Sequence, residues 1–144
     1  EKLMATNEEW IVAFISKPER PAWFHWWTHK DFKHCMAFKY EPLYKVWISY
    51  NWGKNGIDIS ILSKEQMLNA CLYFKDNHNA KFLIAPAKEL PDYYIMELAF
   101  TNCVTAVRHL VGIRKWMITP YKLYCALKSM GCKEYLENIN DKEA

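Results

Sequence analysis

Residues 101–112 read TNCVTAVRHLVG, a pattern that predicts a short amphipathic helix. Thr101 or Asn102 can cap its first turn, and Gly112 can end it. Apolar side chains recur between these ends at helical spacing, at Val104, Val107, Leu110 and Val111. The prediction places one thiol, that of Cys103, in the first turn of the helix.

A cysteine in the first turn of a helix is a candidate nucleophile. Exposed backbone N–H groups and the positive end of the helix dipole favour the thiolate there, which lowers a pKa of about 8.5 in the free residue. The alternative is that Cys103 is a small apolar residue packed beneath the helix. The choice depends on whether the rest of the chain supplies a base.

Length and composition predict one globular domain. The chain has 144 residues, of which 51% are hydrophobic and 16% aromatic. We expect residues 1–133 to form a single domain and residues 134–144 to form a charged tail. The five cysteines contain no C-x-x-C pair, so we expect reduced thiols, no structural metal and no cofactor.

Charge and hydropathy argue against two classes of partner. The net charge of +3 is spread along the chain without a basic run or stripe, so we expect no nucleic-acid partner. No apolar run reaches about 18 residues and the N-terminus lacks a signal-peptide pattern, so we expect no membrane span and no export. The predicted location is the cytoplasm of the producing cell.

Short β-rich runs alternate with helical patterns along the chain. An inner strand is predicted over 10–16, a hairpin over 32–40 and 45–51, and further strands over 57–62 and 81–86. Helices are predicted to begin at Ser63, with a near capping box, and at Thr119, with Pro120 in the first turn. The predicted buried stripe of the first of these helices is Met67, Leu68, Cys71, Leu72 and Phe74. The predicted fold class is α+β, a small antiparallel sheet packed against helices.

The hairpin brings a candidate base close to a polar partner. If the strands are symmetrical about their turn, Tyr40 faces Lys45 and His34 faces Asn51. Opposed residues share a face with Cβ atoms about 5 Å apart, so the Asn51 amide could hold the imidazole. Asp58 on the next strand and Ser49 are alternatives for this role. Cys35, next to His34, should point to the other face and join the core.

Nucleophilic catalysis by a thiol needs an activated cysteine, an imidazole within reach, and a polar group that orients the imidazole. Cys103, His34 and Asn51 meet these needs by residue type. His109 is a poor base for Cys103 because six helical positions place it on almost the opposite side. His25 and His29 are four residues apart but have no third ligand at a recognised spacing, so no metal site is predicted.

On these residues the chain resembles papain-like cysteine hydrolases of the broad NlpC/P60 type. In that superfamily the nucleophile opens a helix packed on an antiparallel sheet, and a histidine and a polar residue lie on neighbouring strands. His34 precedes Cys103, so the resemblance is to the circularly permuted branch. The segments 32–35, 102–104 and 118–124 also look like small uncharacterised proteins encoded by tailed phages.

The stretch WFHWWTH over 23–29 is a dense aromatic patch. It is either core packing with partly exposed rings or a surface for a protein partner, because large aromatic side chains dominate such surfaces. In the second case Trp23, Trp26 and Trp27 would be the partner-binding residues.

The sequence leaves two main candidate functions, and a module that binds a small acyl or peptide ligand in the same cleft is a third. The first is a thiol-dependent hydrolase, a peptidase or amidase that acts on a peptide or amide substrate. The resemblance implies that this hydrolase is phage-encoded and that it acts on peptidoglycan stem peptides or on a phage or host protein. The second is a non-catalytic virion or assembly protein that keeps the papain-like fold and docks through the aromatic patch.

Overall fold

The computed structural model of the chain describes residues 9–16, 29–53, 56–88 and 102–135. These residues form an α+β fold, as the sequence predicts, with five strands in one antiparallel sheet of order β4-β3-β2-β1-β5. In chain order the elements are β1 (Glu9–Ile15), β2 (His34–Glu41), β3 (Val46–Gly53), β4 (Gly56–Leu62), α1 (Lys64–His78), β5 (Lys81–Pro86), α2 (Cys103–Val111) and α3 (Pro120–Ser129).

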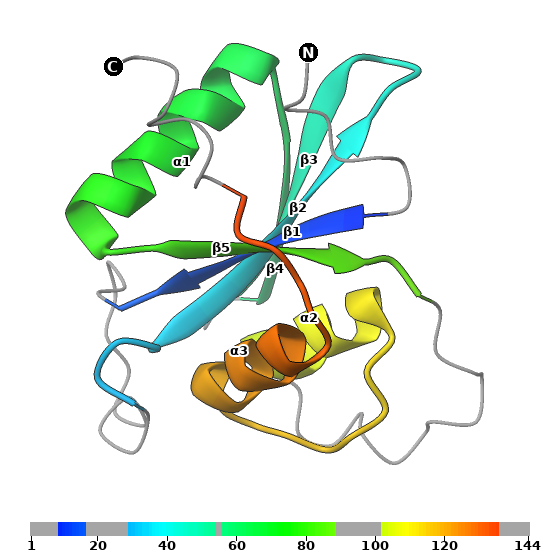
Figure 1. Ribbon diagram of the computed structural model, residues 1–144. Helices are drawn as coiled ribbons and strands as arrows, with labels where there is room; N and C mark the ends of the chain where they lie inside the picture. The colour runs from blue at the N-terminus through cyan, green and yellow to red at the C-terminus, as the bar shows by residue number, and fades with distance from the viewer. Residues whose placement is uncertain (1–8, 17–28, 54–55, 89–101, 136–144) are drawn as a thin grey trace.

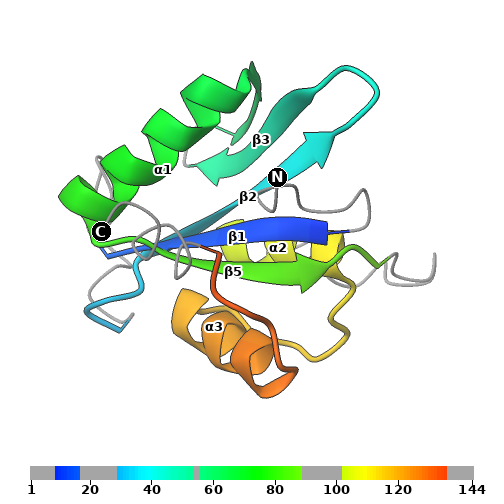
Figure 2. The same cartoon turned by 45° about the horizontal axis from the view of Figure 1, so that its top comes forward.

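Helices cover both faces of the sheet. Helix α1 lies on one face, and α2 and α3 lie on the other (Figure 1 and Figure 2). This arrangement explains why β1 is apolar at nearly every position, since residues 11–15 are all buried although they alternate between the two faces. The predicted inner strand is confirmed, because β1 lies between β2 and β5.

Two apolar clusters follow from the two covered faces. The cluster beneath α2 and α3 contains Val12, Phe14, Cys35, Ala37, Leu83, Val104, Val107, Val111, Leu123 and Leu127. The cluster beneath α1 contains Ile11, Ala13, Ile15, Met36, Phe38, Tyr40, Trp47, Met67, Cys71 and Phe82. Burial of the Val, Leu, Ile, Phe and Met side chains in these clusters contributes roughly 1.5–3 kcal/mol each, so both faces stabilise the sheet.

The β2–β3 hairpin forms with a register two residues away from the predicted one. Tyr40 pairs with Trp47 instead of Lys45, because the four-residue turn spans 42–45, one position later along the chain than predicted. A shift of two residues preserves the faces, so His34 and Asn51 still project to the same side. The ladder ends at the pair Ala37 and Tyr50, which leaves His34 beyond its last rung.

Helix α1 buries a narrower stripe than the sequence predicts. The Ser63 and Gln66 capping box is present, with Ser63 Oγ accepting from the Gln66 N–H at 3.1 Å. Met67 and Cys71 are buried, but the predicted core residues Leu68 and Leu72 are 41% and 39% exposed. The prediction for these two leucines was wrong, because the sheet meets only one side of α1.

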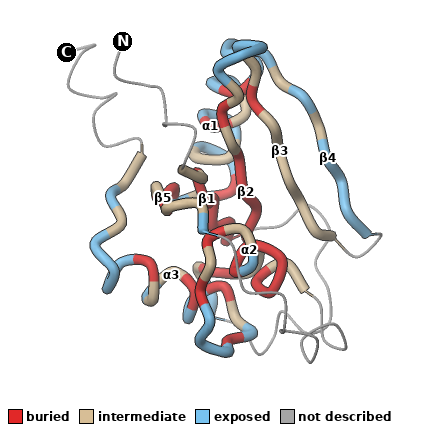
Figure 3. The backbone as a smooth tube through the Cα atoms, turned by 90° about the vertical axis from the view of Figure 1, so that its right-hand side faces the viewer, coloured by how far each residue is buried: buried red, intermediate tan, exposed pale blue. Residues whose placement is uncertain are grey.

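Strand β4 is an edge strand and is exposed along most of its length (Figure 3). Its alternating isoleucines Ile57, Ile59 and Ile61 share one face and are 52%, 60% and 72% exposed. The alternation that predicted this strand is therefore real, but its apolar face packs on no buried cluster among the described residues.

The chain passes α3 and returns along β5. The Ile84 N–H donates to the Lys133 carbonyl at 2.8 Å, and the Tyr135 N–H donates to the Phe82 carbonyl at 3.1 Å. Glu134 forms a bridge with Leu83. The fold thus extends through Tyr135, two residues beyond the predicted domain end at 133.

Helix α2 begins and ends where the sequence predicts. Asn102 caps it, with Oδ1 accepting from the Thr105 N–H at 2.9 Å. Gly112 ends it with φ of 68°, and a Cβ at this position would collide with Lys88. The cap at Asn102 makes Cys103 the first residue of the helix.

No helix in the part of the chain that the structure describes is long and apolar enough to cross a membrane.

Replacing the cap tests how firmly this helix start is held. Asn102 also donates from Nδ2 to the Ile118 carbonyl at 3.1 Å, so Asn102→Ala removes a cap and a link to the segment before α3. We expect the free energy of unfolding to fall by about 1–2 kcal/mol, measured by urea denaturation. Asn102→Ser, which keeps a cap acceptor, should lose less; equal losses would contradict the capping role.

Candidate functional site

Cys103 lies at the N-terminus of α2, where this helix meets the middle of the sheet. The helix contacts β1, β2 and β3. Cys103 itself is half-buried and packs against the apolar cluster beneath α2 and α3. The predicted position of the thiol in a first helical turn is confirmed.

His34 and Asn51 join the start of β2 to the end of β3. Nε2 of His34 lies 2.7 Å from Oδ1 of Asn51. An amide oxygen can only accept, so Nε2 carries the hydrogen and Nδ1 is left free to act as a base. Since the β2–β3 ladder has already ended, this side-chain bond links the two strands beyond their last backbone pair.

The thiol of Cys103 interacts with this imidazole. The hydrogen bond from the Cys35 thiol is the largest cause that holds the pKa of Cys103 well below its usual range, and the hydrogen bond and charge of His34 add to it against the opposing effect of burial. Burial lowers the pKa of His34, but Cys103 and Asn51 outweigh burial, so the net shift is upward. Both shifts favour a thiolate–imidazolium pair.

Cys35 is the residue of the site that the sequence analysis missed. It is fully buried in the apolar cluster beneath α2 and α3, as predicted for a residue facing away from His34. Its thiol and its backbone N–H nevertheless both hydrogen-bond to the Cys103 sulfur. Burial raises the pKa of Cys35, so Cys35 is the thiol that keeps its proton and donates.

A second buried cysteine shows what these donors contribute. Cys71, on α1, is buried in the other cluster, and burial raises its pKa to about 12. Burial acts in the same direction on Cys103. The hydrogen bonds from Cys35 and His34 therefore reverse a shift that burial alone would produce.

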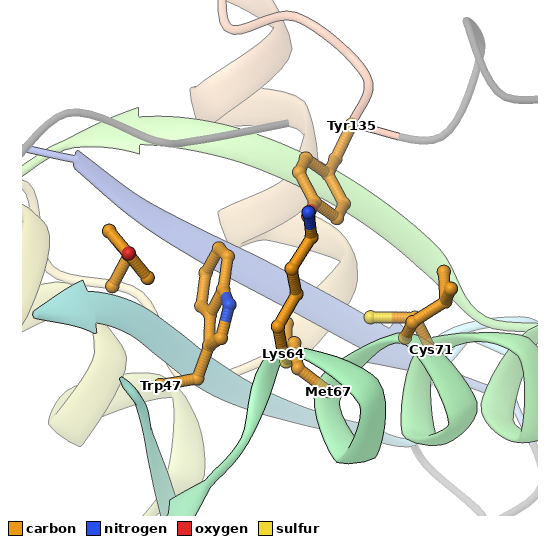
Figure 4. A pocket seen from close by; sticks show the side chains of 7 residues that line it. Trp47, Lys64, Met67, Cys71 and Tyr135 are labelled. Atoms are coloured by element: carbon orange, nitrogen blue, oxygen red, sulfur yellow. The ribbon is translucent and has the colours of Figure 1, made fainter. Parts of the chain in front are cut away.

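A small cavity lies elsewhere, beneath α1 (Figure 4). It has a volume of about 50 Å³ and is lined by Tyr40, Trp47, Lys64, Met67, Leu68, Cys71 and Tyr135. This volume is enough for a few water molecules and too small for a peptide. We therefore place the candidate site at Cys103 and not in this cavity.

The remaining candidates from the sequence fall into three groups. His109 is exposed on α2, and Asp58 lies opposite Asn51 on β4, one strand further from His34. The ring of His29 stacks on Tyr121 at 4.4 Å. Trp23, Trp26 and Trp27, with His25, lie outside the described residues.

Within the described part of the chain, no group of three or more His, Cys, Asp or Glu side chains could hold a metal ion.

Comparisons of the chain with protein families, with curated proteins and with solved structures found no match. The case for a function therefore depends on the arrangement of Cys103, His34 and Asn51.

The lowered pKa of Cys103 predicts how its alkylation depends on pH. A thiolate with a depressed pKa stays reactive as the pH falls, until the pH reaches that pKa. Iodoacetamide should therefore label Cys103 faster than exposed Cys125 at pH 6, measured by peptide mass spectrometry over time. In His34→Ala the pKa of Cys103 should rise, and labelling of Cys103 at pH 6 should slow.

Cys125 in the same sample is the internal control, because removal of His34 should leave its labelling unchanged. If Cys103 labels no faster than Cys125 in the unaltered protein, the thiol is not activated.

Proposed function

We propose that the protein is a thiol-dependent hydrolase that cleaves an amide or ester bond, with Cys103 as nucleophile, His34 as general base and acid, and Asn51 as the group that orients His34. The single observation that carries the proposal is the continuous polar chain from Cys103 through His34 to Asn51, in which the Nε2 to Oδ1 distance is 2.7 Å. Each member fills one of the three roles that thiol catalysis needs.

In the first half of the reaction the Cys103 thiolate attacks the carbonyl carbon of the substrate. The carbonyl oxygen becomes an oxyanion, for which the backbone N–H of Cys103, in the first turn of α2, is a suitable donor. The imidazolium of His34 then gives its Nδ1 proton to the leaving amine or alcohol. The tetrahedral intermediate collapses to an acyl-thioester on Cys103 and releases the first product.

In the second half water restores the enzyme. Neutral His34 removes a proton from a water molecule, which attacks the thioester carbonyl. The C–S bond breaks, the acid product leaves, and the Cys103 thiolate is again paired with the His34 imidazolium. Asn51 accepts from Nε2 throughout, so Nδ1 faces the sulfur in both halves.

The resemblance to circularly permuted NlpC/P60-type hydrolases agrees with this assignment. It favours a peptidase or amidase over an esterase, and peptidoglycan stem peptides or a phage or host protein as substrates. The α+β architecture is compatible with such a hydrolase, but a fold by itself does not carry an activity.

A chromogenic ester tests the two halves of the reaction separately. With p-nitrophenyl acetate we expect a burst of nitrophenolate, an acetyl group on Cys103 by mass spectrometry, and then slow turnover. Cys103→Ala should abolish the burst. His34→Ala should slow acylation by about 10²–10⁴-fold, the usual contribution of a general base.

Asn51→Ala should slow acylation less than His34→Ala, because it leaves the base in place but frees its ring to rotate. Cys125→Ala, which changes an exposed thiol on α3, serves as the control with unaltered kinetics. Acetylation spread over several cysteines, or a Cys103 adduct that forms equally fast without His34, would refute the hydrolase.

A further inference from the structure

We propose that Cys35 and Cys103 form a reversible disulfide when the protein meets a hydroperoxide, which makes Cys103 a modification site in addition to the proposed nucleophile. The inference uses the thiolate character of Cys103 and not hydrolysis. Failure of the disulfide and failure of the proposed function can therefore be told apart.

The geometry of the two sulfurs carries the proposal. Cys35, the second residue of β2, is fully buried in the cluster against which Cys103 packs. The two thiols share a hydrogen bond, so the sulfurs already face each other across the β2–α2 contact. A disulfide requires them to close to about 2.05 Å.

Accessibility assigns different roles to the two thiols. Cys103 is half-buried and can meet a small oxidant, whereas Cys35 is 0% exposed. Cys103 is also the thiol that carries the negative charge and reacts with peroxides. Cys103 is therefore the residue oxidised first, and Cys35 is the residue that resolves the product.

The two steps balance without any further reagent. The Cys103 thiolate attacks one peroxide oxygen, the O–O bond breaks, and the departing oxygen leaves as hydroxide or alkoxide that takes up a proton. The sulfur of Cys35 then attacks the sulfenic sulfur of Cys103, the S–O bond breaks, and water leaves with the proton of the Cys35 thiol. Two thiols lose two electrons and the peroxide gains them.

The product has a consequence for the site. A disulfide removes the nucleophile next to His34 and blocks further oxidation to the sulfinic acid, which most cellular reductants cannot reverse. A reducing dithiol can attack the Cys103 sulfur, which is the accessible one, and expel Cys35. The disulfide thus protects the Cys103 sulfur from irreversible oxidation, and its reduction restores the thiol.

Peptide mapping of the reduced full chain tests the proposal. After treatment with equimolar hydrogen peroxide at neutral pH and blocking with N-ethylmaleimide, we expect a cross-linked peptide pair that joins residues 35 and 103. Three of the five cysteines should remain free thiols, and dithiothreitol should restore all five. Sulfinic acid on Cys103 with Cys35 still free, or a disulfide from Cys103 to Cys125 or Cys132, would overturn the proposal.

Two variants separate a resolving role from simple proximity. In Cys35→Ala, Cys103 loses a donor to its sulfur and should oxidise more slowly than in the unaltered protein. Once oxidised, it should accumulate as a sulfenic acid that dimedone traps, and then as a sulfinic acid. Cys71→Ala removes a thiol of similar burial from the opposite cluster, and it should form the same disulfide as the unaltered protein. If Cys35→Ala does not fold, as judged by circular dichroism, the peptide map of the unaltered chain decides alone.

Discussion

The hydrogen bond from His34 to Asn51 is the constraint on which the site depends. It lies beyond the last backbone pair of the β2–β3 ladder, so no backbone pairing between these two strands fixes one side chain relative to the other. With Nε2 committed to the Asn51 oxygen, the imidazole can offer Nδ1 alone to Cys103. Loss of this bond would leave both the tautomer and the ring orientation undetermined, even with the thiol in place.

Burial opposes the ion pair between the Cys103 thiolate and the His34 imidazolium, so this pair needs further hydrogen-bond donors. Moving a thiolate and an imidazolium out of water costs free energy, and their attraction offsets that cost only when further donors surround them. Cys35 supplies two donors to the sulfur, and the first turn of α2 supplies a favourable dipole. Cys71, which is buried without such donors, shows the opposite shift.

The sequence predicted most of the fold because its local signals are strong. The caps of α1, α2 and α3 and the apolar run of β1 each have one simple structural interpretation. The contact between His34 and Asn51 was also predicted, although the register was two residues off, because side-chain direction repeats every two residues in a strand. The error at Leu68 and Leu72 has a different cause, because the helical period predicts an apolar stripe but not how much of that stripe the sheet covers.

What the sequence could not predict is the role of Cys35. Alternation along β2 correctly predicted that this residue is buried, but it did not predict that α2 covers it, and a core cysteine is ordinarily inert. Its importance arises from the tertiary contact between β2 and the start of α2, which joins residues 35 and 103 and leaves no local pattern. Adjacency to the candidate base His34 was the one available signal.

The polar side chains of Cys103, His34 and Asn51 fit the proposed catalytic role better than a purely structural one. A sheet and a helix can be joined more stably by apolar side chains than by a thiolate, an imidazole and an amide, since each polar group must be desolvated and paired. The neighbouring residues Val104, Val107 and Phe14 provide that apolar packing already. A polar chain placed beside such a core adds little stability, whereas it supplies the charge, the proton acceptor and the orientation that a nucleophilic thiol requires.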